Sequence, residues 1–127
     1  SDLPSKGRVV HGRALGRTIG IPTVNLSVPH DKLLPPKGVY MSRVLVRDNW
    51  YLGVTNIGCK PTIEGKNPIG AETYIIDFGQ DVYGQDIMVE LHKFVRPEMK
   101  FDSIEALKSQ MSADINYTIN YAGSHTF

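Results

Sequence analysis

The sequence predicts a small all-β domain, a β-barrel with one α-helix at its C-terminal end, and three observations lead to this fold class. Short runs rich in β-branched and aromatic residues follow one another between about residues 8 and 96, separated by turn-forming residues. One run, 71–78, carries apolar side chains on both faces, as a strand in a closed barrel or a covered sheet does. After residue 101 the apolar spacing becomes helical. We therefore expect five or six strands and one helix.

The first third of the chain is predicted to be mostly irregular, because glycine and proline interrupt it. Four glycines, at positions 7, 12, 16 and 20, and four prolines, at positions 22, 29, 35 and 36, disfavour long regular elements. Only residues 8–11 are expected to form a strand there. Segment 12–25 is accordingly expected to be a glycine-rich loop.

Regular strands are expected from Gly38 onward. The runs 39–47 and 50–57 are predicted to pair as a hairpin, since Asp48 and Asn49 between them both tolerate positive φ. Further strands are expected at 71–78 and at 87–96, and Pro97 ends the last of them.

The C-terminal segment has the signature of an amphipathic helix over about residues 103–120. Asp102 followed three residues later by Glu105 fits a capping box at the helix start. One stripe of apolar residues recurs at helical spacing, and we expect it to pack on the barrel rather than form a partner-binding groove: Ile104, Leu107, Met111, Ile115 and Ile119.

Length and composition favour one folded domain spanning residues 1–127. A chain of this length builds a single hydrophobic core. Hydrophobic residues make up 41% and charged residues 21%, as in ordinary globular proteins. A lone cysteine, Cys59, cannot form an internal disulfide, and we expect it to be a small buried apolar side chain.

The charge balance excludes broad electrostatic binding to nucleic acid or to anionic lipid. Fourteen Lys and Arg against 13 Asp and Glu leave a net charge of +1, so any anion site must be local. The sequence lacks a long apolar run and a basic N-terminal segment followed by an apolar one. We therefore expect no membrane partner, no signal peptide and a cytoplasmic location.

The glycine-rich segment is the first candidate site. Glycine at four-residue spacing lets the backbone approach a ligand and point its amides at phosphate oxygens. Thr23 and Asn25 offer hard oxygen atoms of the kind that Mg²⁺ accepts beside phosphates, and Arg17 suits the phosphates themselves. The alternative is a surface loop rich in glycine and proline. The spacing does not fit a P-loop or a dinucleotide fingerprint.

Glu72 is the carboxylate that stands out. It lies on the same predicted strand face as Tyr74, Ile76 and Phe78, where a charge is costly unless it has a function or a partner. The alternative is an acid at the barrel rim, paired with Arg or Lys. The four histidines lack the spacing of metal ligands, so a zinc site is not expected.

Taken together, these and further motifs resemble the riboflavin kinase family. The resemblance runs in order along the chain from residue 7 to about residue 114. It rests on Gly12 through Asn25, Leu34-Pro35 with Gly38-Val39-Tyr40, Gly53-Val-Thr-Asn-Ile-Gly58 with Pro61-Thr62, Glu72-Thr73, Asp81-Val-Tyr-Gly84, and Arg96-Pro-Glu98 with Lys100-Phe101.

The resemblance implies a six-stranded Greek-key barrel with a C-terminal helix, an ATP and Mg²⁺ site on one side and a riboflavin site on the other. The expected products are FMN and ADP. By matching position, Thr23 and Asn25 would hold metal and phosphates. The other residues implied near ATP are Gly12 and Arg17 in the glycine loop, with Ile75, Asp77 and Tyr83.

On the flavin side the family pattern points to Arg96, Met99 and Phe101, in the segment leading into the helix. We expect Glu72 to act as general base towards the ribityl 5′-hydroxyl. This assignment requires Glu72 and Thr23 to converge on one reacting phosphoryl group. The chain departs from the family pattern at Val24, usually alanine, and at Met99, where some members have a polar residue.

Two further expectations concern the wider protein and the competing function. In many bacteria this module is the C-terminal half of a bifunctional enzyme that also adenylylates FMN, and 127 residues leave no room for an N-terminal FMN adenylyltransferase domain. We therefore expect a monofunctional enzyme or an excised domain. The alternative function is a non-catalytic module, either a flavin-binding protein or an OB-like small barrel.

Overall fold

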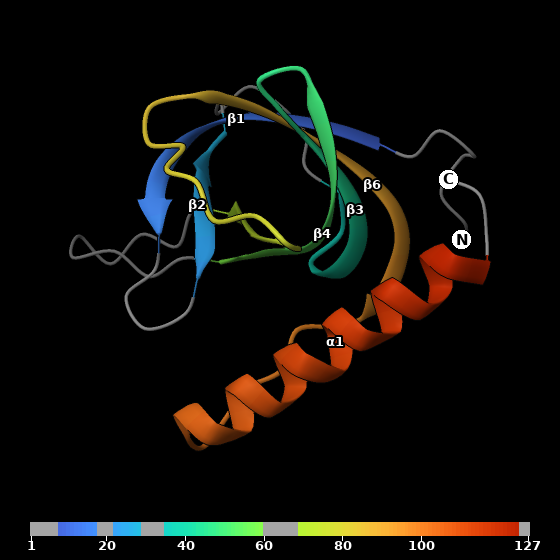
Figure 1. Ribbon diagram of the computed structural model, residues 1–127. Coiled ribbons are helices and arrows are strands. Elements are labelled where there is room, and N and C mark those ends of the chain that lie inside the picture. The colour runs from blue at the N-terminus through green and yellow to red at the C-terminus, as the bar shows by residue number, and fades with distance from the viewer. Residues whose placement is uncertain (1–7, 18–21, 29–34, 60–68, 125–127) are drawn as a thin grey trace, which may run out of the picture.

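Six antiparallel strands close into a barrel, and one helix lies against its outer wall (Figure 1). This computed structural model describes residues 8–17, 22–28, 35–59 and 69–124. The elements are β1 (Arg8–Arg17), β2 (Thr23–Ser27), β3 (Gly38–Val46), β4 (Asn49–Cys59), β5 (Ile69–Ile75), β6 (Asp86–Arg96) and α1 (Ile104–Ser124).

The strand order around the barrel is β1-β2-β5-β4-β3-β6, with β6 pairing back onto β1. Strands β3, β4 and β5 follow one another as neighbours while β2 lies beside β5, which is a Greek-key arrangement. Closure removes the exposed sheet edges. The predicted six-stranded barrel with a C-terminal helix is therefore confirmed. No helix in the described parts of the chain is long and apolar enough to cross a membrane.

The expectation of a loop over residues 12–25 is wrong for most of that segment. Strand β1 continues to Arg17 and β2 begins at Thr23, because β1 finds partners on both sides, β6 and β2. Gly12 is needed for packing rather than for a turn, since a Cβ there would lie 2.9 Å from Leu26 Cβ. Residues 18–21, between the two strands, lie outside the described residues, as do the side chains of Arg17 and Cys59.

The β3–β4 hairpin turns one residue earlier than predicted. Arg47 and Asp48 occupy the turn with φ of 48° and 70°, and Asn49 already pairs with Val46. Two consecutive positive φ values define the type I′ turn that matches strand twist. Strand β5 also ends earlier than predicted, at Ile75, and Asp77 then takes a positive φ of 57°.

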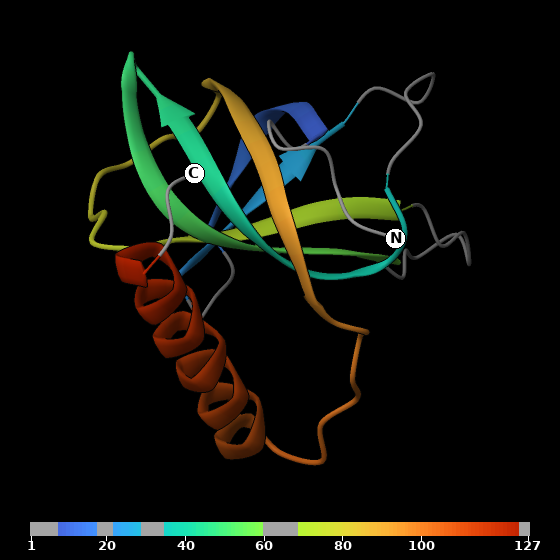
Figure 2. The ribbon, with the colours of Figure 1, turned by 90° about the vertical axis from the view of Figure 1, so that its right-hand side faces the viewer.

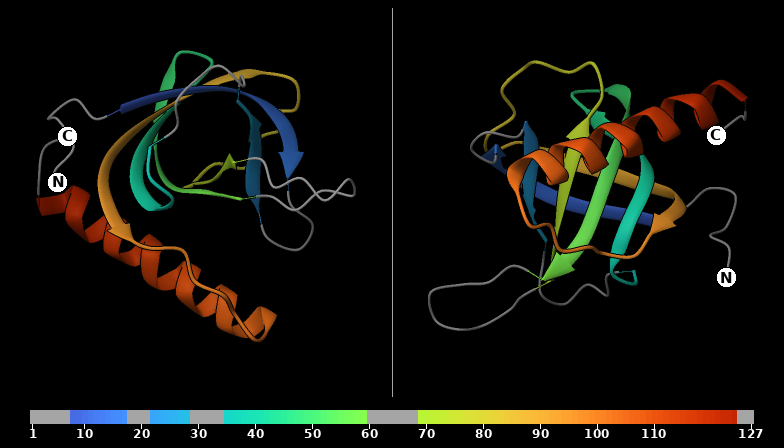
Figure 3. Two further views of the ribbon diagram at one scale, coloured as in Figure 1. Left: turned by 180° about the vertical axis from the view of Figure 1, so that it is seen from behind. Right: turned by 90° about the horizontal axis from the view of Figure 1, so that it is seen from below.

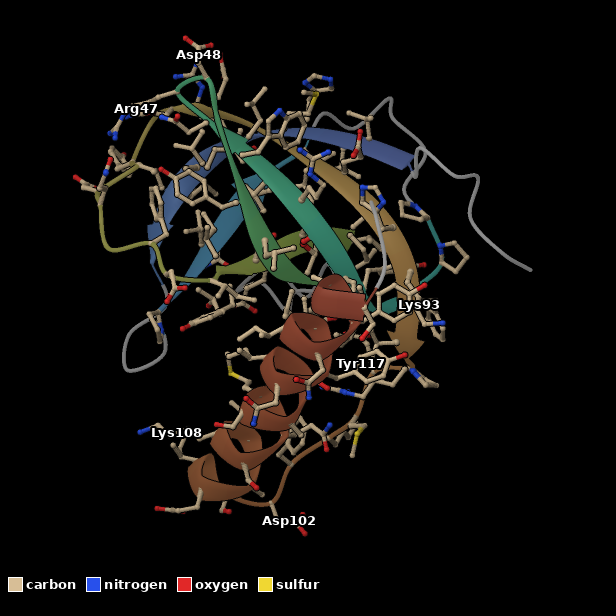
Figure 4. All side chains as sticks on the ribbon, turned by 45° about the vertical axis from the view of Figure 1, so that its right-hand side comes forward. Arg47, Asp48, Lys93, Asp102, Lys108 and Tyr117 are labelled. Carbon is tan, nitrogen blue, oxygen red and sulfur yellow. The ribbon has the colours of Figure 1, made fainter. Side chains whose placement is uncertain are left out.

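The hairpin turn allows a stability prediction. Asp48 lies at the tip of the hairpin, exposed and far from α1 (Figure 4). Because glycine adopts positive φ without steric cost, Asp48→Gly should raise the free energy of unfolding by about 0.5–1 kcal/mol. Chemical denaturation would measure it. Gly84→Ala replaces a glycine at positive φ, 78°, by a residue with a Cβ and should lower the free energy of unfolding. A lower free energy of unfolding in both variants would contradict this account of the turn.

Strand alternation divides the side chains into an interior core and an outer wall. The interior of the barrel holds mainly aliphatic residues: Val10, Ala14, Val24, Leu26, Val44, Val46, Ile57, Ala71, Ile75, Ile87, Val89 and Leu91. Three buried hydroxyls join them, with Thr55 Oγ1 2.9 Å from Ser42 Oγ and 3.0 Å from Thr73 Oγ1. These hydroxyls satisfy one another, so the interior needs no outside ligand.

Helix α1 crosses the outer face of the barrel over β4, as the views from the side and from below show (Figures 2 and 3). Its N-cap is Ser103 rather than Asp102, because Ser103 Oγ accepts a hydrogen bond from the Ala106 N–H at 3.1 Å. The predicted apolar stripe is only partly correct. Ile104 and Ile119 remain 57% and 45% exposed, and the two buried residues of the helix are Asp114 and Thr118.

Candidate functional site

A row of outward-facing side chains runs across five adjacent strands. In register order the residues are Asn25, Glu72, Asn56, Val39 and Arg96. Directly paired residues of antiparallel strands point to the same side of the sheet, so these residues share one face. Their strand neighbours, among them Val24, Ile57 and Ala71, fill the interior of the barrel, so the shared face is the outer wall. The row joins β2 to β6, which are far apart in the sequence.

A cavity of about 220 Å³ lies between this wall, helix α1 and the segment that leads into the helix. Its lining is polar at both ends, with Thr23, Glu72 and Asn56 at one end and Arg96 and Asp114 at the other, and apolar between them. The residues come from strands β2 to β6, from the segment between β6 and α1, and from the helix: Thr23, Val39, Val54, Asn56, Glu72, Tyr74, Arg96, Met99, Phe101, Leu107, Met111, Asp114 and Ile115.

Thr23 and Glu72 meet at one polar end. Thr23 Oγ1 donates a hydrogen bond to Glu72 Oε2 at 2.5 Å, although 49 residues separate them. The contact arises because β2 and β5 are neighbours, with Asn25 paired to Glu72 and Thr23 paired to Tyr74. Thr23 is buried and Glu72 half-buried, so this hydrogen bond is partly shielded from water. The structure thus brings these two side chains together, as the sequence-based hypothesis requires; their convergence on a phosphoryl group stays a prediction.

Arg96 and Asp114 form an ion pair on the far side of the cavity. Arg96 Nη2 donates to Asp114 Oδ2 at 2.8 Å and Nε to Oδ1 at 3.1 Å, so the contact is bidentate. Gln110 Nε2 donates to the same carboxylate at 3.0 Å, and Asp114 is only 4% exposed. This cluster ties β6 to α1 and holds the helix over the cavity. An apolar stripe could not reveal it from the sequence.

The other predicted residues divide into two groups. Met99 and Phe101 line the cavity, together with Arg96. Of the residues implied near ATP, Thr23 lines the cavity, but the described side chains of Ile75, Asp77 and Tyr83 do not: the Ile75 side chain points into the barrel, while Asp77 and the 70% exposed Tyr83 lie in the β5–β6 connection. That connection lies beside β1 near Gly12, since the Gly84 N–H donates to the Ala14 carbonyl at 2.8 Å.

Several cavity residues were not predicted as site residues. Leu107, Met111 and Ile115 were expected only as helix packing. Asn56, Val39 and Val54 belonged to quoted motifs but had no role, and Tyr74 was read only as a strand residue. The alternation of β4 would have placed Val54 and Asn56 on the outer wall, but only the tertiary fold shows that this wall faces a cavity.

The comparison with protein families agrees with this geometry. The profile of the Flavokinase family, described as riboflavin kinase, matches residues 2–122. The chain belongs to the riboflavin kinase family. It is 42% identical over 118 residues to the bifunctional riboflavin kinase/FMN adenylyltransferase of Bacillus subtilis, covering 91% of this chain and 37% of that protein. The chain thus spans about a third of the length of the curated relatives that it matches.

Solved structures show the same fold. A chain from Streptococcus pneumoniae, titled a macrolide-efflux protein, superposes with a TM-score of 0.78 at 32% identity, covering 88% of this chain and 38% of that one. Riboflavin kinase from Trypanosoma brucei superposes with a TM-score of 0.61 at 20% identity, covering 89% of this chain and 75% of that one. The second likeness, at low identity, supports the barrel alone.

The oxygen donors at the end of the cavity with Thr23 and Glu72 can accept a divalent metal ion. Among the described residues no group of three or more His, Cys, Asp or Glu side chains could hold a metal ion. Mg²⁺ does not need such a cage, because it binds through one or two protein oxygens and the phosphates of its nucleotide. The Thr23 hydroxyl lies beside the cavity and Asn25 is two residues along the same strand face. Both offer oxygen ligands.

Proposed function

We propose that this domain transfers the γ-phosphoryl group of ATP to the 5′-hydroxyl of riboflavin, giving FMN and ADP. The observation that carries the proposal is the hydrogen bond between Thr23 and Glu72 at one polar end of a largely apolar cavity. This contact supports a site in which one phosphoryl group would meet both the carboxylate and the hydroxyl. Membership of the riboflavin kinase family supports the choice of substrates.

Glu72 acts as the general base. As the 5′-oxygen attacks the γ-phosphorus, the new oxygen–phosphorus bond forms, the bond to the β,γ-bridging oxygen breaks and the hydroxyl proton passes to the Glu72 carboxylate. The hydrogen bond from Thr23 to Oε2 fixes the orientation of that carboxylate. Orientation matters because most of the rate gain in phosphoryl transfer comes from positioning and electrostatics.

Thr23 can serve the base and a metal at the same time. A hydroxyl has one proton to donate and two lone pairs to offer, so Thr23 can donate to Glu72 while its oxygen faces a cation. Together with Asn25 it would hold Mg²⁺, which supplies positive charge next to the phosphates when bound. ATP would reach this point from the side of Gly12, Asp77 and Tyr83.

Riboflavin occupies the cavity between the barrel wall and α1. Its flat ring suits the apolar surfaces of Val39, Met99, Phe101 and Met111, and Arg96 lies at the same end. The ribityl chain then points towards Glu72. We also propose that FMN adenylylation, the second activity named for the relatives, is carried out outside this chain, because the kinase family match already occupies residues 2–122.

The function is tested by incubating the protein with riboflavin and Mg-ATP and separating the flavins by chromatography. We expect FMN to accumulate with one ADP released per FMN. Tight riboflavin binding without any FMN would instead identify a non-catalytic flavin-binding protein. The absence of both binding and product would remove the proposal.

Thr23 allows a prediction about nucleotide binding. Thr23→Ala should weaken Mg-ATP binding and lower kcat together, each by about 10- to 100-fold, because a hydroxyl bonded to charged groups contributes about 1.5–3 kcal/mol. Thr23→Ser is the matched control, since it keeps the hydroxyl and should retain most of the activity. Titration with Mg-ATP and steady-state rates would measure both effects. An alanine variant with normal nucleotide affinity would exclude Thr23 from the metal site.

A further inference from the structure

Asn56 carries an unexplained polar atom in the wall of the cavity. It projects from β4 on the outer face and lines the cavity. Its Oδ1 is buried and has no hydrogen-bond partner in the part of the chain that the structure describes. A buried acceptor without a partner lowers stability unless something completes it. The other such atom among the described residues, Thr118 Oγ1, belongs to a residue that does not line the cavity.

We infer that the Asn56 carboxamide binds the secondary hydroxyls of the ribityl chain and so selects a polyol-bearing flavin. The inference rests on the proposed function. A carboxamide presents one acceptor oxygen and one donor nitrogen side by side, and a hydroxyl both donates and accepts. Rotation of the amide about its last bond exchanges the two ends, so either can face the substrate. Whichever end faces the substrate, a ribityl hydroxyl can form a hydrogen bond with it.

The position of Asn56 in the row identifies which part of the substrate it meets. Asn56 is paired directly with Glu72 on the next strand, and neighbouring strands are about 4.8 Å apart. With the 5′-hydroxyl at Glu72, the hydroxyls on the following ribityl carbons lie beside Asn56. On the next strand, Asn56 is paired with Val39, and Val39 is in turn paired with Arg96 on β6. Glu72 and Asn56 thus lie where the polyol would bind, and Val39, with the apolar side chains of the cavity, lies where the ring would bind.

The imide edge of the flavin ring is also a match for a carboxamide, but its position does not fit. That edge lies beyond the attachment point of the ribityl chain, several bonds further from the reacting hydroxyl. A substrate whose 5′-oxygen is at Glu72 would bring the imide towards Arg96 and the helix, not to the strand next to Glu72. Asn56 is therefore placed to bind the ribityl hydroxyls and not the imide edge of the ring.

The test uses Asn56→Leu, which keeps the side-chain size and removes both hydrogen-bonding groups. We expect the riboflavin dissociation constant, measured by flavin fluorescence, to rise by about tenfold or more while Mg-ATP affinity stays the same. The melting temperature should be unchanged or higher, because an unpaired buried acceptor has been removed. If Asn56 served only the fold, the melting temperature would fall and riboflavin affinity would not change, which would overturn the inference.

Lumiflavin, which has a methyl group in place of the ribityl chain, distinguishes contacts that Asn56 makes to the ribityl chain from contacts to the ring. Its affinity should be equal in the wild-type protein and in Asn56→Leu; an equal loss for lumiflavin and riboflavin would assign Asn56 to the ring and overturn the inference. Asn56→Ala gives the same comparison if the leucine variant does not fold. FMN formation by the wild-type protein keeps the two proposals distinguishable: no FMN refutes the kinase, whereas FMN with unchanged riboflavin affinity in both variants refutes only the role of Asn56.

Discussion

Replacing Glu72 by Gln should lower kcat by about 10²- to 10⁴-fold, or roughly 3–5 kcal/mol in activation free energy, while riboflavin and Mg-ATP still bind. The amide oxygen of Gln can still accept the hydrogen bond that Thr23 donates, so the geometry of the pair survives. What is lost is the ability to take a proton. Rapid-quench measurement of FMN formed in a single turnover would isolate the chemical step from product release.

Glu90→Gln is the matched control for this experiment. Glu90 also projects outward from a strand, β6, but contacts Arg43 and His92 and does not line the cavity. Its replacement should leave the single-turnover rate close to that of the wild-type protein. If Glu72→Gln turned over at a similar rate to Glu90→Gln, another group would have to be the base, and the proposed chemistry at the Thr23–Glu72 pair would be wrong.

The second large effect concerns the buried ion pair between β6 and α1. Asp114→Ala should lower the free energy of unfolding by about 3 kcal/mol, because it leaves the Arg96 guanidinium largely buried without its carboxylate. For a domain of this size that corresponds to a fall in melting temperature on the order of 10 °C. Riboflavin binding should weaken as well, since the pair holds α1 over the cavity. Calorimetry and flavin titration would measure the two effects.

Two control variants distinguish the effect of losing this buried ion pair from the effect of removing a charge elsewhere. Asp86→Ala removes the acid of the exposed Arg13–Asp86 pair and should change stability by less than about 1 kcal/mol. The double variant Arg96→Met/Asp114→Leu replaces the buried pair by apolar side chains and should recover much of the lost stability. A double variant as unstable as Asp114→Ala would show that packing, not an unpaired charge, explains the loss.

Local sequence patterns were sufficient to predict most of the strands, the helix and their approximate positions. Strand-like runs between turn residues predicted β3, β4 and β6 closely, and the apolar faces of 71–78 predicted a closed or covered sheet. The glycine-rich segment was misjudged, because Gly12 looks like a turn residue but lies in a strand that pairs on both sides. Pairing of distant strands can override low local propensity, which no local pattern reports.

The site was predicted in part for a similar reason. Thr23 and Glu72 were chosen for their chemistry, and Asp114 was not, because a carboxylate inside an apparently amphipathic helix looks like a solvent-facing residue. Its burial follows from Arg96, which reaches it from a different element. Asn56 was overlooked because an unpaired buried acceptor can be recognised only when every neighbour is in place.

By itself the sequence determined the residue chemistry, the alternation that sorts side chains into interior and wall, and membership of the riboflavin kinase family. Only the tertiary structure decided which wall faces a cavity, that Thr23 and Glu72 touch, and that an ion pair ties α1 to β6. The physical reason is that alternation is a property of each strand alone, whereas the neighbours of a strand depend on Greek-key closure of the whole barrel.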